Sequence, residues 1–537
     1  MSASSGRTTG EAAAGGVTAL RRWLPTLLLL LALLPITLKI PAAARFSESI
    51  LTYPFQVDDS EGVILSEAQL LARGVDPYQP ARPDFFTAAP YTPIFTLINA
   101  AAFAVGPFTF KVGRGVAWLA TLAVVLLVGG LVWWRTRRPL LALWAGLGLL
   151  TINLVSVWSV RARPDHLALA CDLAGFAVIW VRWRDIVTAP RPGDRRGLGP
   201  AAWRSLALAI LCFMLGFYTK QTLLAAPVAA GLGLTLARPR VGVAFGLLYG
   251  AAITLPFALL TAITHGGFYQ KIVAFHSSWG ASDFLRLALP ALGRYWPLLL
   301  GGATLLLAVA ITAARAPRPL AALRTDPDLL PALYLPVAAF FALGAGTHGG
   351  NHNHFIETLV VAVLGAALAI GRFAVRGRGL PLAAALLVAL SLALGGEDRL
   401  GEPGWLARDF RPPLAREREG WANVAAFVTN DPDPVYADNV GLLLVAGKEV
   451  RYTDPFSLAF AVRTGQWDDS ALVARVERGE FSLIALRYDL FAPDVTGPPD
   501  DLTPGLYAAI RAHYRVIESN VVILYAPKQV GGRQWCR

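Results

Sequence analysis

Long apolar runs separated by short polar loops organise the first three quarters of the chain. A membrane-crossing helix needs roughly 20 apolar residues, and eleven runs approach or reach that length. They lie near 23–40, 112–134, 140–160, 166–181, 203–219, 222–237, 241–264, 291–314, 331–346, 355–371 and 380–395. A further apolar stretch at 91–110 would reverse the direction of every later span if it crossed, so we interpret it as a re-entrant or interfacial helix. The pattern predicts a polytopic all-α membrane protein with about 11 transmembrane helices.

The last part of the chain follows a different pattern, in which short strand-like runs alternate with helical ones. The strand-like runs lie at 434–438, 481–488, 514–519 and 521–527, and the helical ones at 470–479 and 505–514. This alternation is typical of a small α/β domain. We therefore divide the chain into a tail at 1–22, a transmembrane domain at 23–396 with an outer loop at 41–111, and a soluble domain at 397–537.

Composition and charge support a membrane protein and predict its orientation. Hydrophobic residues make up 55% of the chain and charged residues 16%, which is too apolar for a soluble protein. The soluble domain holds 20 acidic and 16 basic residues, so of the net +12 it carries −4 and the rest of the chain +16. Basic residues in short loops stay cytoplasmic, and they give no reason to expect nucleic acid as a partner. We expect a multi-pass protein of a bacterial-type plasma membrane, with its N-terminus cytoplasmic and its C-terminal domain extracytoplasmic.

Polar residues that are unusual for membrane-embedded sequence fall on the predicted outer face. They occur at Asp58, Asp59 and Glu61 and in the segments 161–166, 218–222, 264–276 and 346–357. Charged groups near the bilayer are costly and are usually functional. A solvated loop bordering the membrane is the alternative for each segment taken alone. Their convergence on one surface favours a shared site.

Acids and cations supply the candidate chemistry. Asp58 or Asp59 could act as a general base toward an acceptor hydroxyl. Arg161, Arg163 and Lys220 offer donors suited to a phosphate at membrane depth. The arginines could instead anchor the interface, the lysine could extend toward it, and Asp165 could cap the helix that it begins.

A second group of polar side chains suits substrate binding. We assign this role to Asp165, Gln221, His276, Asn351, Asn353, His354 and Glu357. His348, His352 and His354 also invite a metal interpretation, but paired glycines loosen their spacing and no HExxH motif is present. The sequence indicates no definite cofactor, and it leaves open whether a divalent metal is required.

With these residues in place, the chain resembles the GT-C superfamily of polytopic glycosyltransferases, which includes protein O-mannosyltransferases and the lipid A aminoarabinose transferase. The resemblance covers a first span, an outer loop with an acidic pair, an apolar segment beginning Tyr91-Thr-Pro93, and a later span leading to Arg163-Pro-Asp165. Asp58-Asp59 stands where the family has its acidic pair, and Asp165 where it has a second outer-loop acid. The short loops and the separate C-terminal domain depart from those enzymes.

The resemblance implies a sugar donor carried on a polyprenyl phosphate and a glycan, lipid or protein acceptor. One acid of the pair, Asp59 in narrow preference to Asp58, would deprotonate the acceptor hydroxyl as it displaces the lipid phosphate with inversion. Arg161, Arg163 and Lys220 would stabilise the leaving phosphate. The departures from the family leave the sugar and the acceptor unassigned.

Three other functions fit parts of the pattern. A transporter for a lipid-linked sugar would need polar residues deep in several spans and inverted-repeat symmetry, and neither is evident. A polysaccharide polymerase or ligase would favour a large outer loop between late spans, but those loops are short here. A scaffold would not need eleven spans as an anchor.

Overall fold

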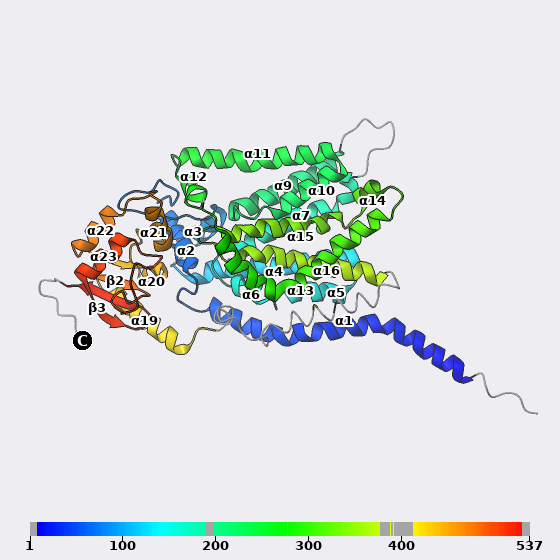
Figure 1. Cartoon of the computed structure of the whole chain (residues 1–537), viewed down its shortest axis with the longest axis horizontal. Coiled ribbons are helices and arrows are strands. Elements are labelled where there is room, and N and C mark those ends of the chain that lie inside the picture. The colour runs from blue at the N-terminus through cyan, green and yellow to red at the C-terminus, as the bar shows by residue number, and fades with distance from the viewer. Residues whose placement is uncertain are drawn as a thin grey trace, which may run out of the picture.

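A bundle of long helices carries a small mixed domain at one end, and we call this end of the bundle the domain end (Figure 1). The computed structural model describes residues 8–187, 198–276, 278–375 and 412–528, together with Leu387 and Leu390. The predicted span at 380–395 and the boundary at 396/397 lie outside the continuous described ranges.

Each of the ten predicted spans that falls within the described ranges coincides with a helix or a bent helix pair. Seven are apolar helices at least 18 residues long, and an eighth is a pair bent by 64°. The long ones are α1 (Thr8–Leu51), α4 (Phe110–Thr136), α9 (Pro200–Thr219), α11 (Pro239–Ile263), α13 (Ala281–Ala314), α15 (Leu329–Phe341) continued by η2 (Ala342–Gly346), and η3 (His352–Phe355) continued by α16 (Ile356–Val375). The bent pair is α5 (Pro139–Leu149) and α6 (Asn153–Ser159). The predicted polytopic all-α fold is confirmed.

Besides α5 and α6, three apolar helices in the described part of the bundle are shorter than a straight membrane crossing. Helix α7 (Asp165–Val181) has 17 residues and α10 (Ala225–Ala237) has 13, which at 1.5 Å per residue gives roughly 26 Å and 20 Å. Spans were predicted at both positions, so the lengths of the described helices do not by themselves confirm eleven crossings. Helix α3 (Ile94–Val105) has 12 residues. Its length agrees with a segment that does not span, and its place relative to the bilayer stays a prediction.

Small residues allow the central helices to pack closely. Added Cβ atoms at Gly302 of α13 and Gly365 of α16 would lie 2.7 Å from Ala362 and 3.0 Å from the Gly302 carbonyl oxygen, respectively. Such close approach is typical of helices that associate in membranes, where the hydrophobic effect does not drive association. Helix α16 is the most buried of the seven long apolar helices, so the residues just before it are held firmly at the domain end.

The C-terminal domain has the predicted strands and helices. Its sheet has the order β1-β2-β4-β3, with β1 parallel to β2 and the other pairs antiparallel. The strands are β1 (Val435–Ala437), β2 (Leu483–Leu486), β3 (Tyr514–Ser519) and β4 (Ile523–Pro527). The helices are α19 (Ala415–Asn430), α20 (Val440–Val445), α21 (Pro455–Arg463), α22 (Ser470–Glu477) and α23 (Pro504–His513).

The loop after α2 (Asp59–Ala72) joins this domain to the bundle. The Phe86 amide donates to the Arg451 carbonyl oxygen at 2.9 Å, and the Thr453 amide donates to the Phe86 carbonyl oxygen at 3.0 Å. The Phe86 ring is fully buried, with ring centroids 5.7 Å from Phe275 and 5.3 Å from Trp467. Residues from the first loop, from η1 (Ala274–His276) and from the domain thus share one core.

We expect Phe86→Ala to weaken the attachment of the C-terminal domain. Removing a buried phenylalanine costs about 3–5 kcal/mol in free energy of unfolding. The midpoint of thermal unfolding of the full chain in detergent measures this loss. The matched control is Phe85→Ala, since the neighbouring ring is only half-buried. Equal midpoints for the two variants would contradict the shared core.

Candidate active site

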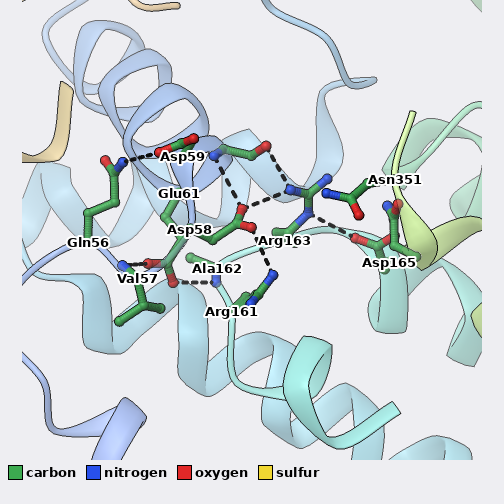
Figure 2. A network of polar contacts seen from close by, with 12 residues as sticks. Gln56, Val57, Asp58, Asp59, Glu61, Arg161, Ala162, Arg163, Asp165 and Asn351 are labelled. Atoms are coloured by element: carbon green, nitrogen blue, oxygen red, sulfur yellow. Dashed lines mark hydrogen bonds and ion pairs between the residues drawn. The ribbon is translucent and has the colours of Figure 1, made fainter. Parts of the chain in front are cut away.

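The start of α2 holds the acidic pair at the domain end (Figure 2). Asp58 has extended backbone and caps the helix, because its side chain accepts a hydrogen bond from the Ser60 amide at 3.2 Å. Asp59 is the first helical residue. A carboxylate at a helix N-terminus is stabilised by the free amide groups there, which explains locally why the sequence places acids at this turn.

A buried ion pair fixes the position of this turn. Both side chains of Glu61 and Arg114 are 0% exposed, and the Arg114 Nη2 atom lies 2.7 Å from Glu61 Oε2. The Arg114 Nε atom donates to the other carboxylate oxygen at 2.8 Å. Its two Nη atoms also donate to the carbonyl oxygens of Ile50, Tyr53 and Phe55 at 2.6–2.8 Å. One arginine on α4 therefore fixes the chain between α1 and α2.

The Glu61 carboxylate also joins the acidic turn to the arginine segment. It accepts hydrogen bonds from the amides of Val57 and Ala162, each at 2.9 Å. Ala162 lies between Arg161 and Arg163, so the carboxylate sets the distance between these arginines and Asp58. Figure 2 shows both amides directed at Glu61.

Asp58 lies between the two arginines. The Arg161 Nη1 atom donates to Asp58 Oδ2 at 2.9 Å, and the Arg163 Nη1 atom donates to Asp58 Oδ1 at 2.8 Å. Both guanidinium groups also stack on the Trp158 ring, 4.7 Å and 4.4 Å from its centroid. Burial alone would raise the pKa of Asp58, but the guanidinium groups of Arg163 and Arg161 and the Ser60 amide lower it below its ordinary value.

Arg163 extends the network toward a second acid. Its Nη2 atom donates to the Tyr91 hydroxyl at 2.7 Å, and its Nε atom lies 3.5 Å from Asp165 Oδ2. Burial raises the pKa of Tyr91 to about 12 although the nearby guanidinium opposes this effect. The tyrosine therefore stays a neutral hydrogen-bonding group at physiological pH.

Asp165 connects the network to Lys220 and to the segment before α16. The Lys220 Nζ atom donates to Asp165 Oδ1 at 2.5 Å, and the Asn353 Nδ2 atom donates to the same oxygen at 2.7 Å. Burial lowers the pKa of Lys220, while the Asp165 carboxylate opposes that shift. These side chains line a cavity of about 20 Å³ together with His354 and Glu357, which is room for about one water molecule.

Asp59 points to a different partner and is far more exposed. Its side chain is 69% exposed, whereas that of Asp58 is 10% exposed. Its Oδ1 atom accepts a long hydrogen bond of 3.4 Å from Gln56, and its Oδ2 atom lies 3.0 Å from the Nη1 atom of Arg487 in the C-terminal domain.

The structure thus brings together Asp58, Arg161, Arg163, Asp165, Lys220 and Asn353 in one continuous network, with His354 and Glu357 on its cavity. Asn351 lies beside Arg163 and Asp165 (Figure 2) and caps η3 through a 2.7 Å hydrogen bond from the His352 amide. Gln221 instead links the loop before α10 to the Pro90 carbonyl oxygen at 2.8 Å. His276 ends η1, and its side chain lies outside the described residues.

The three histidines do not converge on one point. His348 stacks on the Phe456 and Phe460 rings of the C-terminal domain, whereas His354 lines the Lys220 cavity. Within the described ranges, no group of three His, Cys, Asp or Glu side chains is placed to hold a metal ion. Among the described residues, this histidine segment therefore does not form a metal site.

Four residues of interest escaped the sequence analysis. Arg114 stands as a lone charge near the start of a predicted span, and that position was an available signal of function or buried pairing. Asp172 inside α7 is another such charge, fully buried and without a hydrogen-bond partner for either carboxylate oxygen among the described residues. Tyr91 lies in the Tyr-x-Pro segment, but nothing local indicated its bond to Arg163. Arg487 gave no signal in a domain with many charged residues.

Comparison with solved structures identifies the architecture. ArnT from Cupriavidus metallidurans bound to undecaprenyl phosphate matches 93% of this chain and 99% of its own, with a TM-score of 0.57 and 14% identity. The apo state of the same protein gives a TM-score of 0.57 and 13% identity over 96% of this chain and 98% of its own. The chain has the GT-C fold.

A second GT-C protein supports this identification. The archaeal oligosaccharyltransferase AglB from Archaeoglobus fulgidus, in complex with an inhibitory peptide and a dolichol-phosphate, matches 95% of this chain and 75% of its own, with a TM-score of 0.52 and 11% identity. At these identities the likeness concerns the fold alone. No protein-family model matches the sequence, and no curated protein matches it. The GT-C resemblance that we inferred from the sequence is confirmed as a fold.

Proposed function

We propose that this chain is a membrane glycosyltransferase that transfers a sugar from a polyprenyl-phosphate donor to an acceptor hydroxyl. The observation that carries the proposal is the network of Asp58, Arg161, Arg163, Asp165 and Lys220 at the domain end of a GT-C fold. A phosphate leaving group needs cations, and a polyprenyl chain requires the site to lie beside the membrane.

The solved GT-C structures support the choice of donor. One was determined with undecaprenyl phosphate and another with a dolichol-phosphate, and both ligands are lipid monophosphates. We extend this ligand class to the present chain. The acceptor is a glycan, lipid or protein that carries a hydroxyl group. The protein would work in a bacterial-type plasma membrane, with the site and the C-terminal domain on the extracytoplasmic side.

In the proposed reaction, Asp59 removes the proton from the acceptor hydroxyl. The oxygen forms a bond to the anomeric carbon while the bond from that carbon to the phosphate oxygen breaks, which inverts the configuration. The electron pair leaves with the polyprenyl phosphate. Arg161, Arg163 and Lys220 stabilise the charge that develops on the leaving group.

The surroundings of the two acids favour Asp59 over Asp58 as the base. Both carboxylate oxygens of Asp58 accept hydrogen bonds from arginine, and its pKa is lowered, so it binds a proton weakly. Asp59 is 69% exposed, and one of its two hydrogen bonds is long. An acceptor therefore has access to Asp59 without breaking the pairs around Asp58.

Binding of the donor phosphate at Lys220 requires the cavity there to widen. The cavity beside Lys220 holds about 20 Å³, whereas a phosphate group is larger than the single water that fits there. Lys220 is bonded to Asp165, so the donor phosphate would share or displace this contact. The cost of opening would be recovered by charge-assisted hydrogen bonds to the phosphate.

Radiolabelled polyprenyl-monophosphate sugars and the purified protein in detergent provide the test of the enzyme class. We expect release of free polyprenyl phosphate from at least one donor of the panel. A parallel reaction with EDTA asks whether a divalent metal is needed. No turnover with any monophosphate donor, together with binding of a diphosphate-linked glycan, would favour a polymerase, ligase or transporter instead.

We expect Lys220→Met to raise KM for the donor by about 10- to 100-fold, because a hydrogen bond to a charged group contributes roughly 1.5–3 kcal/mol. Steady-state kinetics at several donor concentrations measure this change. Lys220→Met also leaves Asp165 without its cation, so Lys220→Met combined with Asp165→Asn is the matched control. Donor affinity restored in the double variant would place the role of Lys220 in neutralising Asp165 rather than in binding phosphate.

A further inference from the structure

Arg487 is the point at which the C-terminal domain reaches the acidic pair. It directly follows β2, and Asp438 directly follows the neighbouring parallel strand β1. Ligand-binding residues of α/β sheets commonly lie at the carboxyl ends of parallel strands. In this chain, that edge of the sheet faces the start of α2, where Arg487 Nη1 lies 3.0 Å from Asp59 Oδ2.

Asp438 holds Arg487 in this orientation. Its Oδ2 atom accepts the Arg487 backbone amide at 2.8 Å and the Arg487 Nε atom at 3.1 Å. The Asp438 side chain is 2% exposed, so it is a fixed partner. Asp501 lies 3.6 Å from the same Nε atom. The inner side of the guanidinium is thereby anchored in the domain, and its Nη1 atom is directed at Asp59.

The domain around Arg487 is otherwise acidic. Burial raises the pKa of Asp438 to about 6, and burial also raises the pKa of Asp454 and of Asp501. Asp59 lies close enough to raise the pKa of both Asp454 and Asp501 further by repulsion. The ionisable groups that face the Asp59–Arg487 pair are Asp438, Asp454, Asp501 and the Tyr488 hydroxyl.

We propose that Arg487 is a positioning residue for the acidic pair, which holds the Asp59 side chain in place from the C-terminal domain and so makes that domain part of the active site. This inference rests on the proposed function, with Asp59 as the base. Without the guanidinium, the Asp59 side chain would lose its ion pair with the domain and would face the side chains of Asp454 and Asp501.

Two substitutions separate the charge of Arg487 from its shape. Arg487→Gln removes the charge, whereas Arg487→Lys keeps it but lacks the fork that reaches Asp438 and Asp59 at once. We expect Arg487→Gln to lower kcat about tenfold or more, because the Asp59 side chain loses the partner that fixes its orientation.

The lysine variant should lose less kcat than the glutamine variant, because its ammonium group still offers an ion-pair partner to Asp59. KM for the donor should stay unchanged in both variants, since the ion pairs of Arg487 are with Asp59, Asp438 and Asp501 rather than with the proposed phosphate-binding residues. The matched control is Arg478→Gln, which removes an exposed arginine of the same domain paired with Glu480. We expect the control to match the parent protein in kcat and in KM for the donor.

The outcomes distinguish this inference from the proposed function. Parent-level kcat in Arg487→Gln, with an active parent protein, would overturn the role of Arg487 and leave the transferase proposal standing. An inactive parent protein with every donor would overturn both. If Arg487→Gln does not elute as a folded species, Asp438→Asn serves as the test variant instead. It removes the carboxylate that anchors Arg487 and should therefore also lower kcat. Parent-level kcat in that folded variant would also overturn the inference.

Discussion

Asparagine in place of Asp59 is expected to reduce sugar transfer by about 10²–10⁴-fold, the usual contribution of a general base. The substitution keeps the shape of the side chain and removes its ability to accept the proton. Because the Asp59 side chain is 69% exposed, folding should change little. Release of polyprenyl phosphate from the active donor measures the effect, and donor binding measured separately should stay near that of the parent protein.

Asp58→Asn is the necessary comparison, since it acts on the same turn with different contacts. It leaves Arg161 and Arg163 with a neutral partner in a buried site, so we expect a lower thermal midpoint and weaker donor binding as well as lost activity. A variant Asp59→Asn that turns over as fast as the parent protein, beside a folded and inactive Asp58→Asn, would move the base to Asp58.

The largest expected effect on stability comes from the Glu61–Arg114 pair. Breaking a buried ion pair from one side costs about 3–5 kcal/mol. Arg114→Met leaves the Glu61 carboxylate buried without its cation and also removes the donors to three carbonyl oxygens. We expect a strongly reduced yield of folded protein and a clearly lower midpoint of thermal unfolding.

A double-mutant cycle tests whether this cost arises from the unpaired charge. Glu61→Gln alone should destabilise strongly, and Glu61→Gln combined with Arg114→Met should cost much less than the sum of the single changes. Strict additivity would show that the two side chains act independently. A parent-like midpoint for Glu61→Gln would show that the ion pair does not fix the acidic turn.

Most of the helical architecture follows from the sequence because membrane helices satisfy their backbone hydrogen bonds internally. Apolar length and loop charge are local properties, so the spans and the strands of the C-terminal domain were predictable. The pair α5 and α6 is bent, and α10 is short. Such departures depend on packing against neighbouring helices, and this packing cannot be predicted from the length of an apolar run.

The polar network was predictable in its members because charges beside membrane spans are rare. Five charged residues stood out in an apolar context and were expected to lie close together. In the structure they form one network: Asp58, Arg161, Arg163, Asp165 and Lys220. The role of each in binding a donor stays a prediction. Gln221 and Asn351 also stood out as polar residues, yet the Gln221 side chain bonds to the Pro90 carbonyl oxygen and that of Asn351 to the amide of the adjacent His352.

The sequence by itself determined the class of protein, the spans, the small α/β domain and the cluster of charges at one end, since each follows from composition and short-range periodicity. Only the tertiary structure decided which charged residues pair with one another. Arg487 reaches Asp59 across 428 positions of the chain, and Phe86 joins the core of a domain that begins more than 300 residues later. Such pairs depend on how the loops dock, and docking minimises the free energy of the whole chain rather than of any one segment.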